Sequence, residues 1–275
     1  MPRANKMIMR WLVSYINMNQ DEPDLRFFET LLNDPNDTVM YLKTNDKPGR
    51  FWREMTENNI NGKVDFELPV AFSGNSNKIK FGVFYSYKER NLDGLQFDIQ
   101  TSNTKLPTRD IDQWLIDDVI SLDNEYGYHY TADGIQDQNN SYTGDQGVGA
   151  AYAMIDFQLV RNLRMVAGAR LETSDITINN LIEDPDHQLY KSGELHEVDI
   201  LPSIGLIWAM NEEMNLRLAG SKTIARPTFR ELGTNYYDYK TGILYIGNQE
   251  LQRSEIYNVD LRWEWFFKPG EKLAA

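Results

Sequence analysis

The side chains that most often do chemistry in proteins are present in this chain, but they are not spaced as in a catalytic or metal site. The three histidines, His129, His187 and His196, share no helical or hairpin spacing that would turn two imidazoles toward one metal ion. There is no cysteine, which excludes thiolate ligands and disulfides. Gly-rich phosphate loops, nucleophile elbows and zinc motifs are absent from the sequence, and its carboxylates lack a partner at fixed spacing. We therefore expect no catalytic residue, no metal and no cofactor, and a protein that is not an enzyme.

One acidic segment, Asn91–Gln146, carries aromatic residues that could bind a ligand. Eleven of its residues are Asp or Glu, and two are Lys or Arg. Trp114 lies in a helix-like patch, and Tyr126, Tyr128 and Tyr130 alternate like a short strand. These four aromatic side chains are candidate ligand contacts. A solvated, structured outer loop is the simpler explanation of the same residues.

Composition and charge exclude several classes of protein. The 275 residues are 41% hydrophobic, which is enough for a sizeable core, and carry a formal net charge of -13. A nucleic-acid partner is not expected, because neutralising phosphates needs clustered Lys and Arg. No run of about 20 apolar residues predicts a transmembrane helix, and Met1–Arg10 lacks the apolar stretch of a secretory signal. Strands of a membrane barrel would escape such scans, because only every second residue meets lipid.

Apolar residues alternate with polar ones through much of the chain, which is the period of β-strands. In the clearest case Tyr257, Val259 and Leu261 begin an apolar series that continues to Phe267, with polar residues between them. The same alternation predicts further strands around residues 63–68, 80–88, 151–159, 163–172 and 214–219.

The connections between these strands are alternately long and short. The long ones are expected at Gln20–Gly49, Asn91–Gln146, Asn180–Glu194 and Arg226–Gln252, and the short ones at Ser73–Asn77, Arg161–Asn162 and Asn211–Glu213. Outer-membrane barrels place all long loops outside the cell and all short turns in the periplasm, whereas a soluble sandwich has no reason to sort them. Aromatic residues near the short turns, among them Phe157, Trp208 and Trp265, fit the girdle of such a barrel.

The stretch from Ser221 to Glu271 resembles the barrel of TonB-dependent receptors. It reads SKTIARPTFREL, then a tyrosine-rich loop, then GNQELQRSEIYNVDLRWEWFFKPGE. The residues that carry the resemblance are Ala225, Arg226, Pro227, Phe229, Arg230, Glu231, Leu232, Gly247, Asn248, Leu251, Ser254, Asn258, Asp260, Arg262 and Glu264. The match is specific in order and spacing over this stretch and is weaker over the first half of the chain.

The resemblance implies an all-β, antiparallel, up-and-down transmembrane barrel of about 22 strands around an N-terminal plug. Such a barrel lies in the outer membrane of a Gram-negative bacterium and takes up a siderophore, cobalamin or an oligosaccharide. Its partners are outer-membrane lipid, the small-molecule or oligosaccharide ligand, and TonB–ExbB–ExbD acting through a plug domain that is absent from this chain. With about eight strands recognised, we expect residues 1–275 to be one partial barrel domain, an internal fragment, with 91–146 as a long acidic extracellular loop.

If the apolar faces meet lipid, a second set of residues points into the lumen. This set is Lys63, Asp65, Glu67, Asp156, Arg164, Arg170, Arg217, Asp260, Arg262 and Glu264. Their mixed signs are compatible with cross-strand ion pairs and equally with a solvated wall. Two alternatives to the receptor remain: a small closed barrel with a structural or adhesive role, and a soluble all-β carbohydrate-binding or hydrolytic domain.

Overall fold

The computed structural model describes residues 6–31, 41–42, 48–72, 75–101, 110, 112, 116, 120, 128–131, 141–180, 192–233, 235–238, 243–268 and 271–274. The strands are β1 (Ile8–Phe27), β2 (Thr30–Leu31), β3 (Tyr41–Leu42), β4 (Gly49–Phe72), β5 (Asn75–Thr101), β6 (Tyr128–Thr131), β7 (Tyr142–Val160), β8 (Leu163–Asn180), β9 (Gly193–Ala209), β10 (Met214–Ala225), β11 (Asn235–Asp238), β12 (Ile243–Ile246), β13 (Ser254–Lys268) and β14 (Glu271–Ala274). A short helix, α1 (Phe229–Gly233), follows β10. No helix in this described part of the chain is long and apolar enough to cross a membrane.

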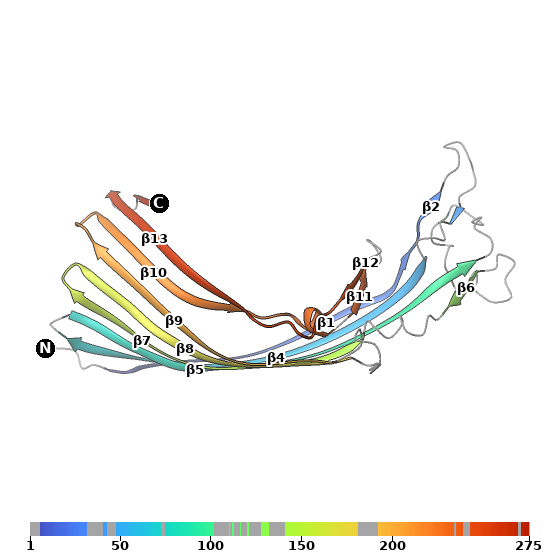
Figure 1. The fold of residues 1–275 in the computed structure, drawn as a ribbon, viewed down its shortest axis with the longest axis horizontal. Helices are drawn as coiled ribbons and strands as arrows, with labels where there is room; N and C mark the ends of the chain where they lie inside the picture. The colour runs from blue at the N-terminus through green and yellow to red at the C-terminus, as the bar shows by residue number, and fades with distance from the viewer. Residues whose placement is uncertain are drawn as a thin grey trace.

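The main sheet is a curved antiparallel meander (Figure 1). Its order is β1-β4-β5-β7-β8-β9-β10-β13-β14, with β6 beside the end of β5, so each long strand pairs with the long strands before and after it in the sequence. Among the described residues, β1 does not pair with β13 or β14, and the sheet is therefore open. The predicted partial barrel is confirmed. The alternative in which these strands close on themselves as a small barrel is wrong for this structure.

The predicted sorting of connections is also confirmed. The short turns, Arg161–Asn162 between β7 and β8 and residues 210–213 between β9 and β10, lie at one end of the sheet. The described elements of the long connections, among them β2, β6, β11 and β12, lie toward the other end (Figure 1). The alternation follows from the topology, because consecutive antiparallel strands return to the same end at every second connection.

Several strands run further into the expected long loops than the sequence pattern indicates. The loop expected at Gln20–Gly49 begins only after Phe27, because β1 stays paired with β4 across a bulge between Glu22 and Leu25. Asp24 in this bulge has φ 56° and accepts a hydrogen bond of 2.6 Å from Arg50 Nε.

The loop expected at Asn91–Gln146 is shorter for the same reason. β5 continues to Thr101, and β7 begins at Tyr142. In the extension of β5, Leu95, Phe97 and Ile99 alternate with Gln96, Asp98 and Gln100, so the apolar alternation resumes beyond the polar residues 88–91. Of the four candidate ligand contacts, Trp114 and Tyr126 lie outside the described residues, and Tyr128 and Tyr130 lie on β6, which pairs with β5.

The two faces of the sheet differ as the alternation predicts. On β13 the outward side chains Tyr257, Val259 and Leu261 are 72%, 80% and 67% exposed. In register with them on β10, Leu218 lies opposite Leu261 and Gly220 opposite Val259, whereas Lys222 lies opposite Tyr257 toward the long connections. The interleaved charged residues point to the inner, concave face. An apolar band therefore covers the convex face of the sheet.

This assignment of faces predicts opposite effects for two adjacent substitutions on β13. Leu261→Arg places a charge in the apolar band, and we expect it to cost roughly 2–4 kcal/mol of folding free energy in a bilayer. Arg262→Leu removes an inner-face partner of Glu264 at 3.4 Å, but Arg217 still holds that carboxylate at 2.7 Å, so the fold should tolerate it. The folded fraction is measured by heat-modifiable gel mobility. Equal losses in the two variants would contradict the assignment of faces.

Candidate functional site

The segment that follows β10 turns inward and places α1 on the concave face of the sheet. Pro227 and Thr228 precede the helix, and Thr228 caps it: its backbone N–H donates to Glu231 Oε2 at 2.7 Å and its hydroxyl donates to the same oxygen at 2.9 Å. A Thr followed three residues later by Glu is the sequence signature of a capped helix start. The hydrogen bond from the Thr228 backbone lowers the pKa of Glu231 below its ordinary value of 4.5.

Two apolar side chains of α1 form the centre of the core cluster on this face. Phe229 and Leu232 are buried against Leu92, Tyr142, Ile176, Ile178 and Leu195, which come from β5, β7, β8 and β9. The rings of Tyr142 and Phe229 meet edge-on, with centroids 6.4 Å apart. The helix is therefore seated on the wall by apolar burial, although it is only five residues long.

The close approach of α1 to the wall requires glycine on the strands below it. A Cβ at Gly144 of β7 would lie 3.1 Å from the ring of Phe229, and one at Gly193 of β9 would lie 3.1 Å from the backbone oxygen of Leu232. Both distances are shorter than an ordinary van der Waals contact. The two glycines thus form the depression that α1 occupies.

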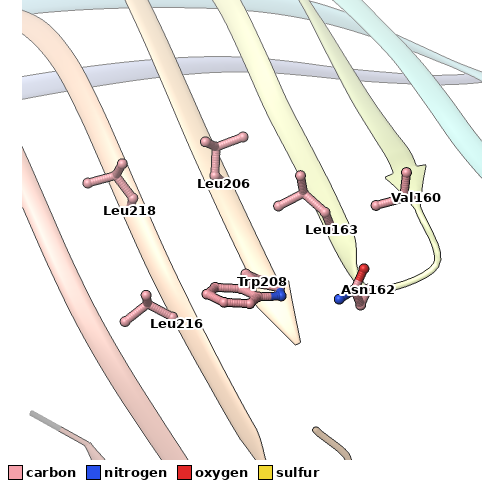
Figure 2. A pocket seen from close by; sticks show the side chains of 7 residues that line it. All are labelled: Val160, Asn162, Leu163, Leu206, Trp208, Leu216 and Leu218. Atoms are coloured by element: carbon pink, nitrogen blue, oxygen red, sulfur yellow. The ribbon is translucent and has the colours of Figure 1, made fainter. Parts of the chain in front are cut away.

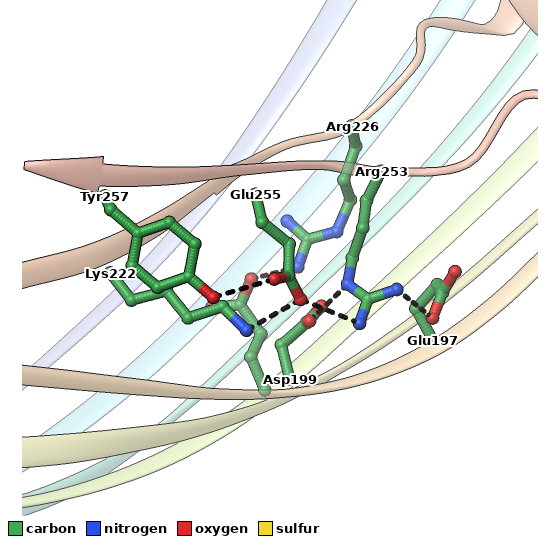
Figure 3. A network of polar contacts seen from close by, with 8 residues as sticks. Glu197, Asp199, Lys222, Arg226, Arg253, Glu255 and Tyr257 are labelled. Carbon is green, nitrogen blue, oxygen red and sulfur yellow. Dashed lines mark hydrogen bonds and ion pairs between the residues drawn. The ribbon is translucent and has the colours of Figure 1, made fainter.

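Two arginines join the ends of this segment to acidic residues on the inner face (Figure 3). Arg226 pairs with Glu172 of β8, and Arg253 pairs with Asp199 of β9 and, at 2.6 Å, with Glu197. The side chain of Asp199 is 0% exposed and that of Glu172 is 8% exposed. A buried carboxylate without a cation is strongly destabilising. These pairs therefore fix the position of the segment on the inner face of the sheet.

The second part of the motif, which begins at Gly247 and Asn248, packs against the first part, residues 226–232. The backbone N–H of Asn248 donates to the carbonyl of Glu231 at 2.7 Å, and the Asn248 side chain accepts a hydrogen bond of 2.9 Å from the N–H of Glu250. Leu251 then packs on the core cluster. Residues 226–232 and 247–251 are therefore one structural unit on the inner face, which we call the inward segment.

Nearer the short turns, the inner face is a wall of cross-strand ion pairs. Glu67 is buried and pairs with Lys78 at 2.8 Å, with Arg10 at 3.3 Å and with Lys80 at 3.5 Å. Further cross-strand pairs join Arg164 to Asp156 and Arg217 to Glu264, and Lys63 pairs with Asp65 along β4. Of the two interpretations of these charges, ion pairing is the one observed.

The motif residues divide between these two regions. Arg226, Phe229, Glu231, Leu232 and Asn248 make the contacts of the inward segment, beside Ala225, Pro227, Arg230 and Gly247. Asn258, Asp260, Arg262 and Glu264 lie instead on the inner face of β13, where Asn258 donates to Thr223 Oγ1 at 3.1 Å.

The sequence interpretation missed Asp199, Glu197 and Arg253. Glu197 and Asp199 alternate with the outward Val198 and Ile200 on β9. This alternation in the sequence could have identified the two acids as inner-face residues. Within the described residues, no group of three or more His, Asp or Glu side chains could hold a metal ion.

These features define a class: the wall of an outer-membrane-type barrel, apolar outside and ion-paired inside, with an inward-folded connection. The family model for "TonB dependent receptor-like, beta-barrel" matches residues 13–273, and the chain belongs to this family. No curated protein sequence matches the chain at a significant level.

Solved structures support the same fold. The ferripyoverdine receptor of the outer membrane of Pseudomonas aeruginosa, bound to ferripyoverdine, is similar with a TM-score of 0.56 and 12% identity. FpvA of P. aeruginosa bound to heterologous pyoverdines and the FpvAI–pyocin S2 complex give the same two values. Each comparison covers 99% of this chain and 30% of the other chain. The chain thus spans about a third of the length of these receptors.

The close packing of α1 against the sheet can be tested by adding one methyl group to β7. Gly144→Ala places a Cβ 3.1 Å from the Phe229 ring, and we expect the resulting overpacking to weaken docking of the inward segment by about 1–3 kcal/mol. Gly147→Ala on the same strand is the control, because its Cβ would meet only Tyr85 Oη at 3.7 Å. Hydrogen–deuterium exchange of residues 226–253 reports the docking. Unchanged exchange in Gly144→Ala would show that Phe229 does not depend on this close approach.

The cap of α1 predicts a dependence on pH. Because the pKa of Glu231 is lowered in the folded state, its hydrogen bonds with Thr228 contribute stability above the unfolded pKa, and this contribution is lost as the pH falls through the folded pKa. Glu231→Gln should lower stability at neutral pH by about 0.5 kcal/mol, since the carboxylate is largely exposed. The difference in Tm between wild type and variant should shrink on acidification. A difference independent of pH would exclude the ionised cap.

Proposed function

We propose that these strands are part of the wall of an outer-membrane receptor that takes up a scarce nutrient by TonB-dependent transport. The observation that carries this proposal is the inward segment, because residues 226–232 and 247–251 pack on the concave face of the sheet, which would line the lumen of a closed barrel. A ligand that enters from the long-connection end would pass this segment before it reaches the ion-paired wall.

The proposal includes further strands. An open sheet leaves the free edge of β1 without backbone partners among the described strands, and unpaired backbone groups cost several kcal/mol each in hydrocarbon. Closure with additional strands, around a plug on which TonB–ExbB–ExbD acts, would remove both edges. The 30% coverage of the solved receptors is compatible with this arrangement.

The class of ligand is a siderophore, cobalamin or an oligosaccharide. The solved neighbours include a complex with ferripyoverdine, but at 12% identity they support the fold rather than a ligand. Candidate ligand contacts remain the aromatic residues Trp114, Tyr126, Tyr128 and Tyr130 of the long connection between β5 and β7. A soluble carbohydrate-binding domain is the competing proposal, and it predicts a chain that purifies without detergent.

Orientation in the membrane gives a direct test. The chain has no native cysteine, so single cysteines can be placed at Leu31, on β2 in the connection between β1 and β4, and at Glu212, in the short turn after β9; both positions are exposed. In cells whose outer membrane carries these strands within a closed barrel, an impermeant maleimide should label only Leu31→Cys. Both variants should react after the cells are broken. Labelling of Glu212→Cys on intact cells would overturn the proposed orientation.

A further inference from the structure

The convex face of the sheet has hollows of different chemistry. One, close to the short turns, belongs to the apolar band and is lined by hydrophobic side chains and Asn162 (Figure 2). Another lies on β4 and β5, toward the long connections, and has a volume of about 350 Å³. We call it the β4–β5 hollow, and it is lined by Trp52, Arg53, Glu54, Asp93, Gly94, Leu95 and Ser141. Its lining combines an aromatic ring with charged groups, which the hollow in the apolar band does not.

The β4–β5 hollow is separated from the apolar band. On β4 the last exposed apolar residue of the band is Ile60, and the next outward positions toward the long connections are Asn58 and Thr56, which are polar. Glu54 follows them on the same face. The hollow therefore lies beyond the band, on the side of the long connections, and it opens away from the lumen.

Three successive outward rows of paired residues surround the indole of Trp52. From the long connections toward the apolar band, the rows are Arg50–Phe97, Trp52–Leu95 and Glu54–Asp93. The guanidinium carbon of Arg50 is 4.9 Å from the centroid of the Trp52 ring, and the Phe97 ring meets this ring edge-on at 5.8 Å. The indole thus already attracts one cation from the side of Arg50. Its other side borders the hollow and the row of carboxylates.

The two carboxylates of the hollow are not neutralised by a neighbouring cation. Glu54 and Asp93 are exposed and directly opposite each other, and within the described part of the chain neither takes part in a hydrogen bond or an ion pair. Arg53 also lines the hollow, but its Nη2 lies 2.5 Å from each carboxylate oxygen of Glu22. Like charges directly opposite on one face of a sheet destabilise the strand pair. A cation bound between the two acids would remove this repulsion.

We propose that the β4–β5 hollow binds a small, water-soluble organic cation that carries an ammonium group. The ammonium would lie between Glu54 and Asp93 and against the side of Trp52 that faces away from Arg50, and its carbon substituents would contact Leu95. The two carboxylates attract the charge, and the indole adds a cation–π contribution. The site is outside the lumen and is therefore distinct from the proposed route of transport.

Choline is the probe, and isothermal titration of the full chain in a maltoside detergent, which has no ammonium group, measures its affinity. The control ligand is the uncharged tert-butyl analogue of choline, which has the same shape with carbon in place of nitrogen. We expect choline to bind at least about fivefold more tightly than this analogue. Equal affinities, or no binding of choline, would overturn the cation site.

Phosphocholine distinguishes a free ammonium ion from the head group of a lipid. It should bind more weakly than choline, because Glu54 and Asp93 repel its phosphate. Tighter binding of phosphocholine than of choline would assign the hollow to a lipid head group and overturn the proposal.

Neutralising either acid tests the site from the side of the protein. Glu54→Gln and Asp93→Asn should each weaken choline binding about threefold. The control is Glu89→Gln, which removes an exposed carboxylate from β5 outside the hollow and should leave the affinity unchanged. Without choline, Asp93→Asn should raise the Tm, because it removes the repulsion from Glu54. Unchanged choline affinity in both hollow variants, or a lower Tm of ligand-free Asp93→Asn, would contradict the proposal.

Discussion

The constraint on which the rest of this structure depends is the pairing of backbone groups. In hydrocarbon each unpaired N–H or C=O costs several kcal/mol, so a chain that crosses a membrane as strands must pair every strand on both sides. Within the described residues β4 is paired with β5 from Gly49 to Phe72, and β5 with β7 over most of its length. A meander is the simplest topology that satisfies this constraint, and it sorts long connections and short turns to opposite ends. The same constraint makes the two edges of the open sheet its least stable feature.

Once the backbone is paired, the two faces of the sheet are free to meet different surroundings. Near the short turns the outward residues, such as Val259 and Leu261, are apolar, which suits lipid, whereas outward polar pairs such as Tyr87–Asp145 and Lys222–Glu255 lie closer to the long connections. The inward residues carry charges of both signs and neutralise each other across strands, as Glu67 does with Lys78 and Lys80. Buried ion pairs contribute little net stability, because desolvation offsets their attraction, but removing one partner is costly. Their effect is therefore on register and position: Arg226 and Arg253 hold the inward segment above Glu172 and Asp199.

The strands with one apolar face were predictable from sequence, because period two on β7, β8, β10 and β13 leaves a clear pattern. β1 was not found, because it is apolar on both faces: Trp11 and Val13 point outward, and Leu12 and Ile16 lie on the inner face, all exposed. Residues of equal polarity at i and i+1 hide the alternation on which the prediction rests. The extension of β5 was missed although Leu95, Phe97 and Ile99 alternate with polar residues there, because the polar residues 88–91 interrupt the pattern; the end of β1 carries polar residues such as Asn19 and Gln20 on both faces.

The site was predictable as a motif but not as a structure. The sequence identifies Arg226, Phe229, Glu231 and Asn248 as motif residues. The residues of this connection do not by themselves predict that it turns inward rather than outward after β10. That choice depends on residues far away in sequence: Gly144 and Gly193 leave room for the helix.

The apolar surface of the seat comes from Leu92, Tyr142, Ile176 and Ile178. A five-residue helix cannot be stable alone, because nucleation costs more than its few hydrogen bonds return. The capped helix and the part of the sheet on which it packs, including Gly144 and Gly193, must therefore form together. The conformation of the family motif is consequently a property of the wall as much as of the motif itself.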